Sequence, residues 1–322
     1  LGPGEHNFSA DSFFGVGFYR IDNASSATPT ITGPLNKDGS NADIFTRRGI
    51  SRIIVHPTDP AIIFVASTSG VGGIGPIANN VLPNRGVYRS TNATAANPTF
   101  SQVGVLPLPS NSSVRDSAMD PGNPNIMIAN PIISGGTGGI YRTTNAQAAT
   151  PTWTQTFAFT GSTSTSNLTA EFAAIHPALD ANATFYAAAG NNAAGTGAGR
   201  VLKSTDGGAT FTESSATTFC SPQCFYNIAV AVDPTNVNNV FIGGTGANTF
   251  SRSVTGGTIF VASQANLHTD SHVIAVAPSQ PLTIYFGSDG GIYKSTDGGL
   301  KWASLYNATF RTTQFMSIAP HH

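Results

Sequence analysis

A hairpin sequence recurs along the chain, and this repeat constrains the fold more than any other feature. Lys203–Phe211 has the sequence KSTDGGATF, and Lys294–Trp302 has KSTDGGLKW. In such a turn the short carboxylate accepts hydrogen bonds from the turn's own amides. The glycines supply positive φ, and the aromatic residue anchors the hairpin in a core. The pattern therefore predicts a tight β-hairpin at each copy.

Further copies keep the frame but replace the aspartate. Asn is a reasonable substitute, because its side chain also bonds to its own turn and tolerates the left-handed region. The most divergent copy has Thr255 at this position. We expect the turn-forming residues to be Asn23, Asn92, Asn145, Asp206, Thr255 and Asp297, in hairpins near 19–31, 88–100, 141–153, 201–211, 250–260 and 292–302.

A second repeat alternates with the hairpins. It is an apolar strand that ends at a proline, and in most copies another apolar strand soon follows; the prolines are Pro57, Pro121, Pro177, Pro234, Pro278 and Pro320. Four short strands in each unit of roughly 45–65 residues are typical of a β-propeller blade. No segment sustains a 3.6-residue apolar period, so we expect helix to be nearly absent.

These repeats predict one all-β domain over residues 1–322, a single β-propeller of four-stranded blades. The opening residues resemble a second strand, and residues 310–320 resemble a first strand without its blade. The two ends would then complete one blade, which gives six blades in total. Seven blades, or a piece of a longer array, is the alternative.

The charge content excludes some classes of partner. Only 10% of the residues are charged and the net charge is −1, so no basic field attracts nucleic acid or an anionic membrane. No stretch approaches the 18 apolar residues of a membrane-spanning helix. A surface of Ser, Thr, Asn and Gly is common on exported proteins, and we expect an extracellular or cell-surface location.

Two cysteines, Cys220 and Cys224, bracket Ser-Pro-Gln. We favour a disulfide, which fits an oxidising compartment, with free thiols or half a metal site as alternatives. Seven Asn-x-Ser/Thr sequons occur, about as many as this composition gives by chance, so they leave N-glycosylation open. They start at Asn7, Asn23, Asn92, Asn111, Asn167, Asn182 and Asn307.

Two motifs suggest chemistry that their contexts do not support. Gly70–Gly75 spells G-x-G-x-x-G, but Pro76 follows it, and the helix and acidic residue of a dinucleotide site are missing. Phe18–Ile21 resembles the arginine-bearing start motif of sialidases. Its Tyr19-Arg20 pair aligns with Tyr-Arg pairs of the other hairpins, so we interpret it as an ordinary repeat position.

The starts of the first strands predict a site at the mouth of a central channel. Residues of both charge signs and a histidine would converge there, which suits a small polar ligand or an ion. Channel mouths are wet, however, and polar residues belong there without any ligand. The expected ligand-binding residues are Arg115, Glu171, Asn227, Asp270, His272 and Gln314, with Ser51 and Ile228 at equivalent positions and Arg52 and Asp116 nearby.

Metal binding is open at two places. Asp270 and His272 would serve as an orienting pair or as metal ligands, although strand alternation places both on one face in any case. If the ring closes through its ends, a second metal-capable group would gather Glu5, His6, Asn7, Asp11, His321 and His322. We expect no cofactor, and a structural metal ion such as calcium stays open.

The hairpins, the Ile/Val-x-His/Asp-Pro strands and Gly287–Gly299 (GSDGGIYKSTDGG) resemble secreted bacterial aspartate-box (BNR-repeat) propellers. That superfamily includes sortilin-type ectodomains, xyloglucanase-type glycosidases and sialidases. The resemblance covers essentially the whole chain and implies the fold. It transfers little chemistry, because the members differ in function.

The leading hypothesis for function is an exported, non-catalytic propeller that acts as a binding or structural module on a cell surface or extracellular assembly. Its partner would be a protein or a carbohydrate at a propeller face. A xyloglucanase-like or sialidase-like glycoside hydrolase is the first alternative, and it requires two carboxylates facing one groove. A self-assembling subunit of an extracellular filament or sheath is the second.

Overall fold

The computed structural model describes residues 14–69, 82–103, 111–133, 137–159, 169–176, 182–190, 199–215, 217–263 and 265–305. These residues form strands and turns, and the helical element among them is one 3-10 turn, Gly246–Asn248. The prediction of an all-β fold is confirmed.

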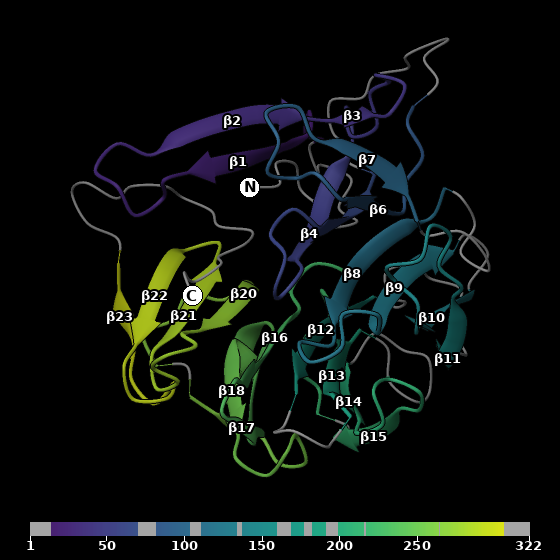
Figure 1. The fold of residues 1–322 in the computed structure, drawn as a ribbon. Helices are drawn as coiled ribbons and strands as arrows, with labels where there is room; N and C mark the ends of the chain where they lie inside the picture. Colours follow the sequence, from purple (N-terminus) through teal and green to yellow (C-terminus); the bar gives the residue numbers. More distant parts are fainter. Residues whose placement is uncertain are drawn as a thin grey trace. The chain divides into compact units, whose positions relative to one another are not determined.

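Four-stranded sheets follow one another along the chain as the blades of a β-propeller (Figure 1). Blade 1 is β4 (Gly49–Val55), β5 (Ile63–Thr68), β6 (Val87–Ser90) and β7 (Thr99–Gln102), with the short β3 (Lys37–Asp38) added parallel to β7. Blade 2 is β8 (Ser113–Met119), β9 (Met127–Ile133), β10 (Thr137–Thr143) and β11 (Thr154–Phe159). Blade 3 is β12 (Ala170–Ile175), β13 (Thr184–Ala189), β14 (Arg200–Ser204) and β15 (Thr212–Ser215). Blade 4 is β16 (Ala229–Asp233), β17 (Asn236–Gly243), β18 (Phe250–Ser253) and β19 (Val261–Ala262), and blade 5 is β20 (Ser271–Val276), β21 (Ile284–Ser288), β22 (Gly291–Ser295) and β23 (Ala303–Ser304).

The prediction of six blades is wrong, because the described residues form five. The first hairpin, near 19–31, belongs to a two-stranded sheet of β1 (Phe18–Asp22) and β2 (Thr30–Leu35). Gly15, just before β1, pairs with Arg48 instead of extending this sheet. A hairpin motif alone therefore does not make a blade. The expected closing strand, 310–320, lies outside the described residues.

The chain divides into two compact units. Unit 1 comprises Leu1–Met119, Asn123–Ser134 and Ile140–Gln155, and unit 2 comprises Asp120–Gly122, Gly135–Gly139 and Thr156–His322. Unit 1 thus contains the β1–β2 sheet, blade 1 and most of blade 2, and unit 2 contains blades 3 to 5.

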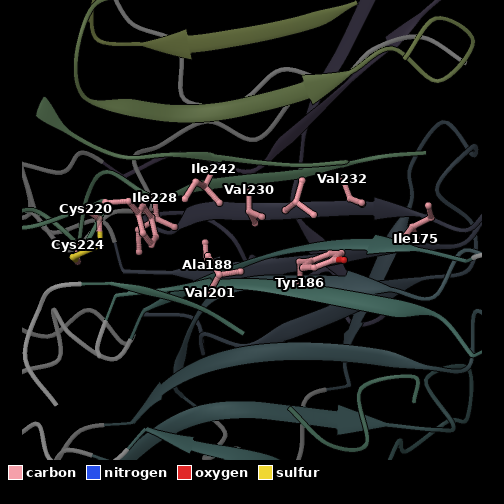
Figure 2. Packing of buried hydrophobic residues seen from close by; sticks show 12 residues of the cluster. Ile175, Tyr186, Ala188, Val201, Cys220, Cys224, Ile228, Val230, Val232 and Ile242 are labelled. Carbon is pink, nitrogen blue, oxygen red and sulfur yellow. A yellow bond between two sulfur atoms is a disulfide. The ribbon is translucent and has the colours of Figure 1, made fainter. Parts of the chain in front are cut away.

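The core of unit 2 lies between consecutive blades, and strand alternation produces it. On β16, Val230 and Val232 pack with residues of blade 3, among them Tyr186. Ala229 and Ala231 point the other way and pack with blade 5. Figure 2 shows Val230 and Val232 facing Tyr186, with the Cys220–Cys224 disulfide at one end of the same cluster. A first strand therefore needs apolar residues on both faces, which explains its continuous apolar sequence.

The hairpin turns are held by side chains acting as acceptors. The Asp206 carboxylate accepts from the Ser204 hydroxyl at 2.7 Å and from the Thr210 amide at 3.0 Å. Asp297 repeats this with the Ser295 hydroxyl at 2.9 Å and the Lys301 amide at 2.9 Å. We call these capped turns.

Glycine is required inside the capped turns for two reasons. Gly299 has φ +84°, and a Cβ at this position would lie 2.8 Å from the Phe250 ring of the preceding blade. The Asp297 turn of blade 5 thus lies directly against Phe250 of blade 4.

The substituted copies form related turns. Asn92 accepts from the Thr99 amide and Asn145 from the Thr152 amide, both at 2.9 Å. The hydroxyl of Thr255 accepts from the Ile259 amide at 3.0 Å.

The first hairpin differs from these copies. Asn23 has φ 55°, but the neighbouring carboxylate of Asp22 accepts the side-chain hydrogen bonds, from Arg20 at 2.8 Å and Thr32 at 3.0 Å.

A cation on the third strand of a blade donates to the capped turn of the next blade. Arg89 donates to the carbonyls of Ala146 and Ala148, at 3.0 and 2.8 Å. Lys203 points to the Gly256 carbonyl at 3.5 Å. We call these contacts forward clamps.

The Tyr19-Arg20 pair also makes a forward clamp. Arg20 donates to the carbonyls of Ala93 and Ala95, both at 2.8 Å, from the β1–β2 sheet to blade 1. This repeat position therefore has a structural role.

Replacing Arg89 by Met should lower the free energy of unfolding by about 1–2 kcal/mol, because two hydrogen bonds from a charged donor are lost while the aliphatic stem remains. Chemical denaturation would measure it. Lys301→Met, at an exposed position, is the control and should have little effect. Equal stability of the two variants would contradict a stabilising clamp.

The capped turn at Asp297 should make stability depend on acid pH. The Lys301 amide, with help from Ser295 and Leu300, holds the pKa of Asp297 below its usual 3.8. The contribution of Asp297 to the free energy of unfolding is therefore complete at pH values above its unfolded-state pKa, and it is lost as the pH falls through its folded-state pKa. Relative to Asp297→Asn, the wild type should be more stable at pH 6, and this advantage should vanish near pH 2. Asp297→Ala should cost about 1 kcal/mol at pH 6, since it also removes the acceptor. A wild-type advantage that does not change with pH would contradict this.

The disulfide should stabilise the chain by about 2 kcal/mol, the loop-closure value for so short a loop. Both cysteines are buried, so Ala is the substitution that avoids a new buried hydroxyl. The Cys220→Ala/Cys224→Ala variant should unfold at lower denaturant than the oxidised wild type. The reduced wild type should show a similar loss, and an unchanged midpoint in both would refute the role.

Candidate functional site

Polar side chains gather in unit 2 where β16 and β20 begin. We call Gln223, Tyr226, Asn227, Thr245, Asp270, His272 and Asp289 the polar cluster. Asn227 and Asp270 precede the two first strands, and Asp289 follows β21, the antiparallel partner of β20. Blades 4 and 5 therefore both contribute to one end of the sheet pair.

Asn227 joins the two blades. Its side-chain amide donates to Asp270 Oδ1 at 2.6 Å and to Gln223 Oε1 at 3.0 Å. Asp270 Oδ1 also accepts from the Thr245 hydroxyl at 3.1 Å. Asn227 is fully buried, and its Oδ1 has no hydrogen-bond partner among the described residues. A buried acceptor without a partner costs free energy, so its persistence indicates that the surroundings fix this side chain.

Asp270 has an unusual backbone. Its φ is 65°, in the left-handed region that Asp adopts more readily than most residues. The amide of Asp289 donates to the Asp270 carbonyl at 3.2 Å, which ties the two connecting turns together. Strain of this kind often accompanies functional positions.

His272 pairs with Asp289. Its Nε2 lies 2.5 Å from Asp289 Oδ1, and the two residues come from strand β20 and from the turn after β21. The His272 side chain is buried, whereas that of Asp289 is 36% exposed. The ring of Tyr226 meets the imidazole edge-on, with centroids 4.9 Å apart. Asp270 and His272 are not hydrogen-bonded to each other, so the orienting pair is His272 and Asp289.

The disulfide supports this arrangement. Cys220 and Cys224 close a tight loop in which the Gln223 amide donates to the Cys220 carbonyl at 2.8 Å. The Gln223 carbonyl in turn accepts from the amides of Tyr226 and Asn227. The predicted disulfide is confirmed, and it fixes the backbone that carries three members of the cluster.

The polar cluster has the chemistry of a recognition surface. Asp289 presents a partly exposed carboxylate. Tyr226, which contacts the His272 ring, and Phe225, which contacts the Tyr226 ring, are partly exposed as well. Carboxylates accept from hydroxyl groups, and aromatic rings offer flat apolar area.

Two other expected ligand-binding residues lie in the first strands of other blades. Arg115 lies in β8 of unit 1 and Glu171 in β12 of unit 2, both buried. Gln314 lies outside the described residues. In unit 1, Asp116 binds Arg52 through both carboxylate oxygens, at 2.5 and 2.8 Å, and the Ser51 hydroxyl donates to the Val114 carbonyl.

Sequence reasoning missed Asp289, Tyr226, Gln223 and Thr245. Asp289 lies in the motif Ser288-Asp-Gly-Gly, whose acidic residue at the end of a second strand was the available signal. The others lie in connections whose course depends on the disulfide and on the 3-10 turn Gly246–Asn248, and their positions have no local sequence pattern.

Metal binding finds no support in the described part of the chain. There, no three His, Cys, Asp or Glu side chains gather as a metal site would require. The group expected from Glu5, His6, Asn7, Asp11, His321 and His322 lies outside the described residues, as does Gly70–Gly75. Among the described residues no helix is long and apolar enough to span a membrane.

Comparison with known proteins gives likenesses of fold. No protein-family model matches the sequence, and no curated protein matches it. An ancestral GH74 enzyme is similar over 61% of this chain and 24% of its own, with 19% identity and a TM-score of 0.42. The GH74 enzyme of Niastella koreensis is similar over 91% of this chain and 62% of its own, with 13% identity and a TM-score of 0.33. YCF48 from Cyanidioschyzon merolae is similar over 80% of this chain and 84% of its own, with 16% identity and a TM-score of 0.43. The chain thus spans less than two thirds of these GH74 enzymes, and the likenesses extend no further than the β-propeller architecture.

Proposed function

We propose that this chain is an exported, non-catalytic binding module whose polar cluster recognises a polar ligand, first of all a carbohydrate. The observation that carries the proposal is the His272–Asp289 pair beside Tyr226, which presents a carboxylate and an aromatic ring on a preformed support. Preformed sites with few, well-positioned polar groups are typical of ligand recognition. A protein with hydroxyl-rich or amide-rich loops is the other partner class for the same surface.

The contacts that the Asp270 and Asp289 carboxylates already make favour binding over hydrolysis. A glycosidase needs two carboxyl groups facing one bond, one of which donates a proton. In the polar cluster, Asp270 accepts from Asn227 and Thr245, and Asp289 is paired with His272. Both carboxylates thus hold neighbouring side chains in place.

An extracellular location is part of the proposal. The disulfide persists in oxidising compartments, and the sparse charge of the chain agrees with export. We also propose that the chain belongs to the aspartate-box family and that it carries N-linked glycans. The intact mass of the protein secreted by its native host, measured under non-reducing conditions, tests for the glycans.

The binding role can be tested against a panel of soluble plant and microbial polysaccharides. Affinity electrophoresis would measure retention, and release of reducing ends would measure hydrolysis. We expect retention by at least one polysaccharide without hydrolysis, and about tenfold weaker retention for Asp289→Asn or Tyr226→Ala. Asp297→Asn is the matched control, because it makes the same chemical change at a capped turn of the same blade.

Two results would contradict the proposal. Hydrolysis that is lost in folded Asp289→Asn would establish the glycosidase alternative. Retention that is equal in all the variants would show that the polar cluster is not the site.

A further inference from the structure

Two arginines of unit 1, Arg48 and Arg85, are held near Pro83 and at the start of β8, and in the described part of the chain neither has an acidic partner. Arg48 immediately precedes β4 and is only 4% exposed. Its Nε and Nη2 both donate to the Pro83 carbonyl, with Nε at 2.7 Å. A carbonyl carries only a partial charge, so the guanidinium charge of Arg48 is not neutralised by this contact.

Arg85 lies two residues beyond Pro83 and is half-buried. Its Nε donates to Asn111 Oδ1 at 3.0 Å, and its Nη1 donates to the Ser113 hydroxyl at 3.2 Å. These partners are also neutral. They hold the Arg85 side chain at the start of β8 rather than in the solvent.

The two charges act on each other. Burial, and after it the nearby charge of Arg85, lower the pKa of Arg48 to about 10. Burial also lowers the pKa of Arg85. Desolvating two like charges together is costly unless an opposite charge accompanies them.

Two other arginines of unit 1 have a carboxylate partner. Arg20 pairs with Asp22 and Arg52 with Asp116. The acidic residues Asp38 and Asp43, which line a pocket with Pro83, do not fill this role for Arg48 and Arg85. Asp38 accepts from the Ser40 hydroxyl and from loop amides, and Asp43 pairs with Lys37.

We infer that Arg48 and Arg85 form a binding site for an anionic group, a carboxylate, sulfate or phosphate carried by a small ligand. In the described part of the chain, neither guanidinium has an ion pair, and Arg48 Nη1 and Arg85 Nη2 make no hydrogen bond. Two guanidiniums with such donors suit the planar or tetrahedral oxygens of an anion. This site lies in unit 1 and is independent of the polar cluster.

Titration with sodium sulfate, sodium phosphate and sodium glucuronate tests the inference, at constant ionic strength set with chloride. Isothermal calorimetry would give the dissociation constants, and thermal unfolding would report saturable stabilisation. We expect at least one anion to bind the wild type, and Arg85→Gln to weaken that binding at least about tenfold. Arg20→Gln, an arginine that has its own carboxylate, is the matched control and should bind like the wild type.

The three anions separate the chemical sources. Preference for sulfate or phosphate would identify a tetrahedral oxyanion, and preference for glucuronate would identify a carboxylate, as in an acidic sugar. Arg48→Lys keeps the charge but loses the fork, and it gives a second test if Arg85→Gln fails to fold. Absence of binding by all three anions, or equal binding by the wild type and the arginine variants, would overturn the inference.

Discussion

Each blade depends on its neighbour for half of its core, and the rest of the structure follows from this constraint. A single four-stranded sheet cannot cover its own apolar faces. On β16 the valines pack with blade 3 and the alanines pack with blade 5, so the strand is apolar on both sides. The forward clamps and the capped turns act at the same interfaces, at the hairpin ends of the sheets. Apolar packing and polar contacts therefore stabilise the same pairs of blades.

The tolerance of the capped turns explains how the repeat diverges. The turn needs a short side-chain acceptor, and an aspartate carboxylate, an asparagine amide or a threonine hydroxyl each supplies it. Glycine at the two following positions goes with only some of these acceptors. The copies with Asp206, Thr255 and Asp297 have two glycines there, and at Gly257 and Gly299 positive φ and the close approach of the preceding blade act together. The copies with Asn92 and Asn145 have Ala93 and Thr94, and Ala146 and Gln147, so the asparagine turns do not need glycine.

The sequence predicted local structure well and connections between elements poorly. The strands, the hairpins and the disulfide follow from short-range patterns, such as the two cysteines four positions apart, Cys220 and Cys224. The blade number did not, because the first hairpin pairs as an isolated sheet. Asp289 could not be predicted as the partner of His272 either. The two residues are brought together by the pairing of β20 with β21, which no local sequence pattern shows. Arg48 and Arg85 are 37 positions apart, and no sequence pattern relates them.

The forward clamps have a direction, and this has a consequence for how such a chain can change in length. Arg20 reaches blade 1, Arg89 reaches blade 2 and Lys203 reaches blade 4, always toward the blade that comes later in the sequence. Duplicating one complete repeat keeps a cation such as Arg89 or Lys203 followed by a turn that it can reach. A cut between such a cation and its turn removes the clamp. Among changes in length, those of whole repeats are therefore the ones that preserve the forward clamps.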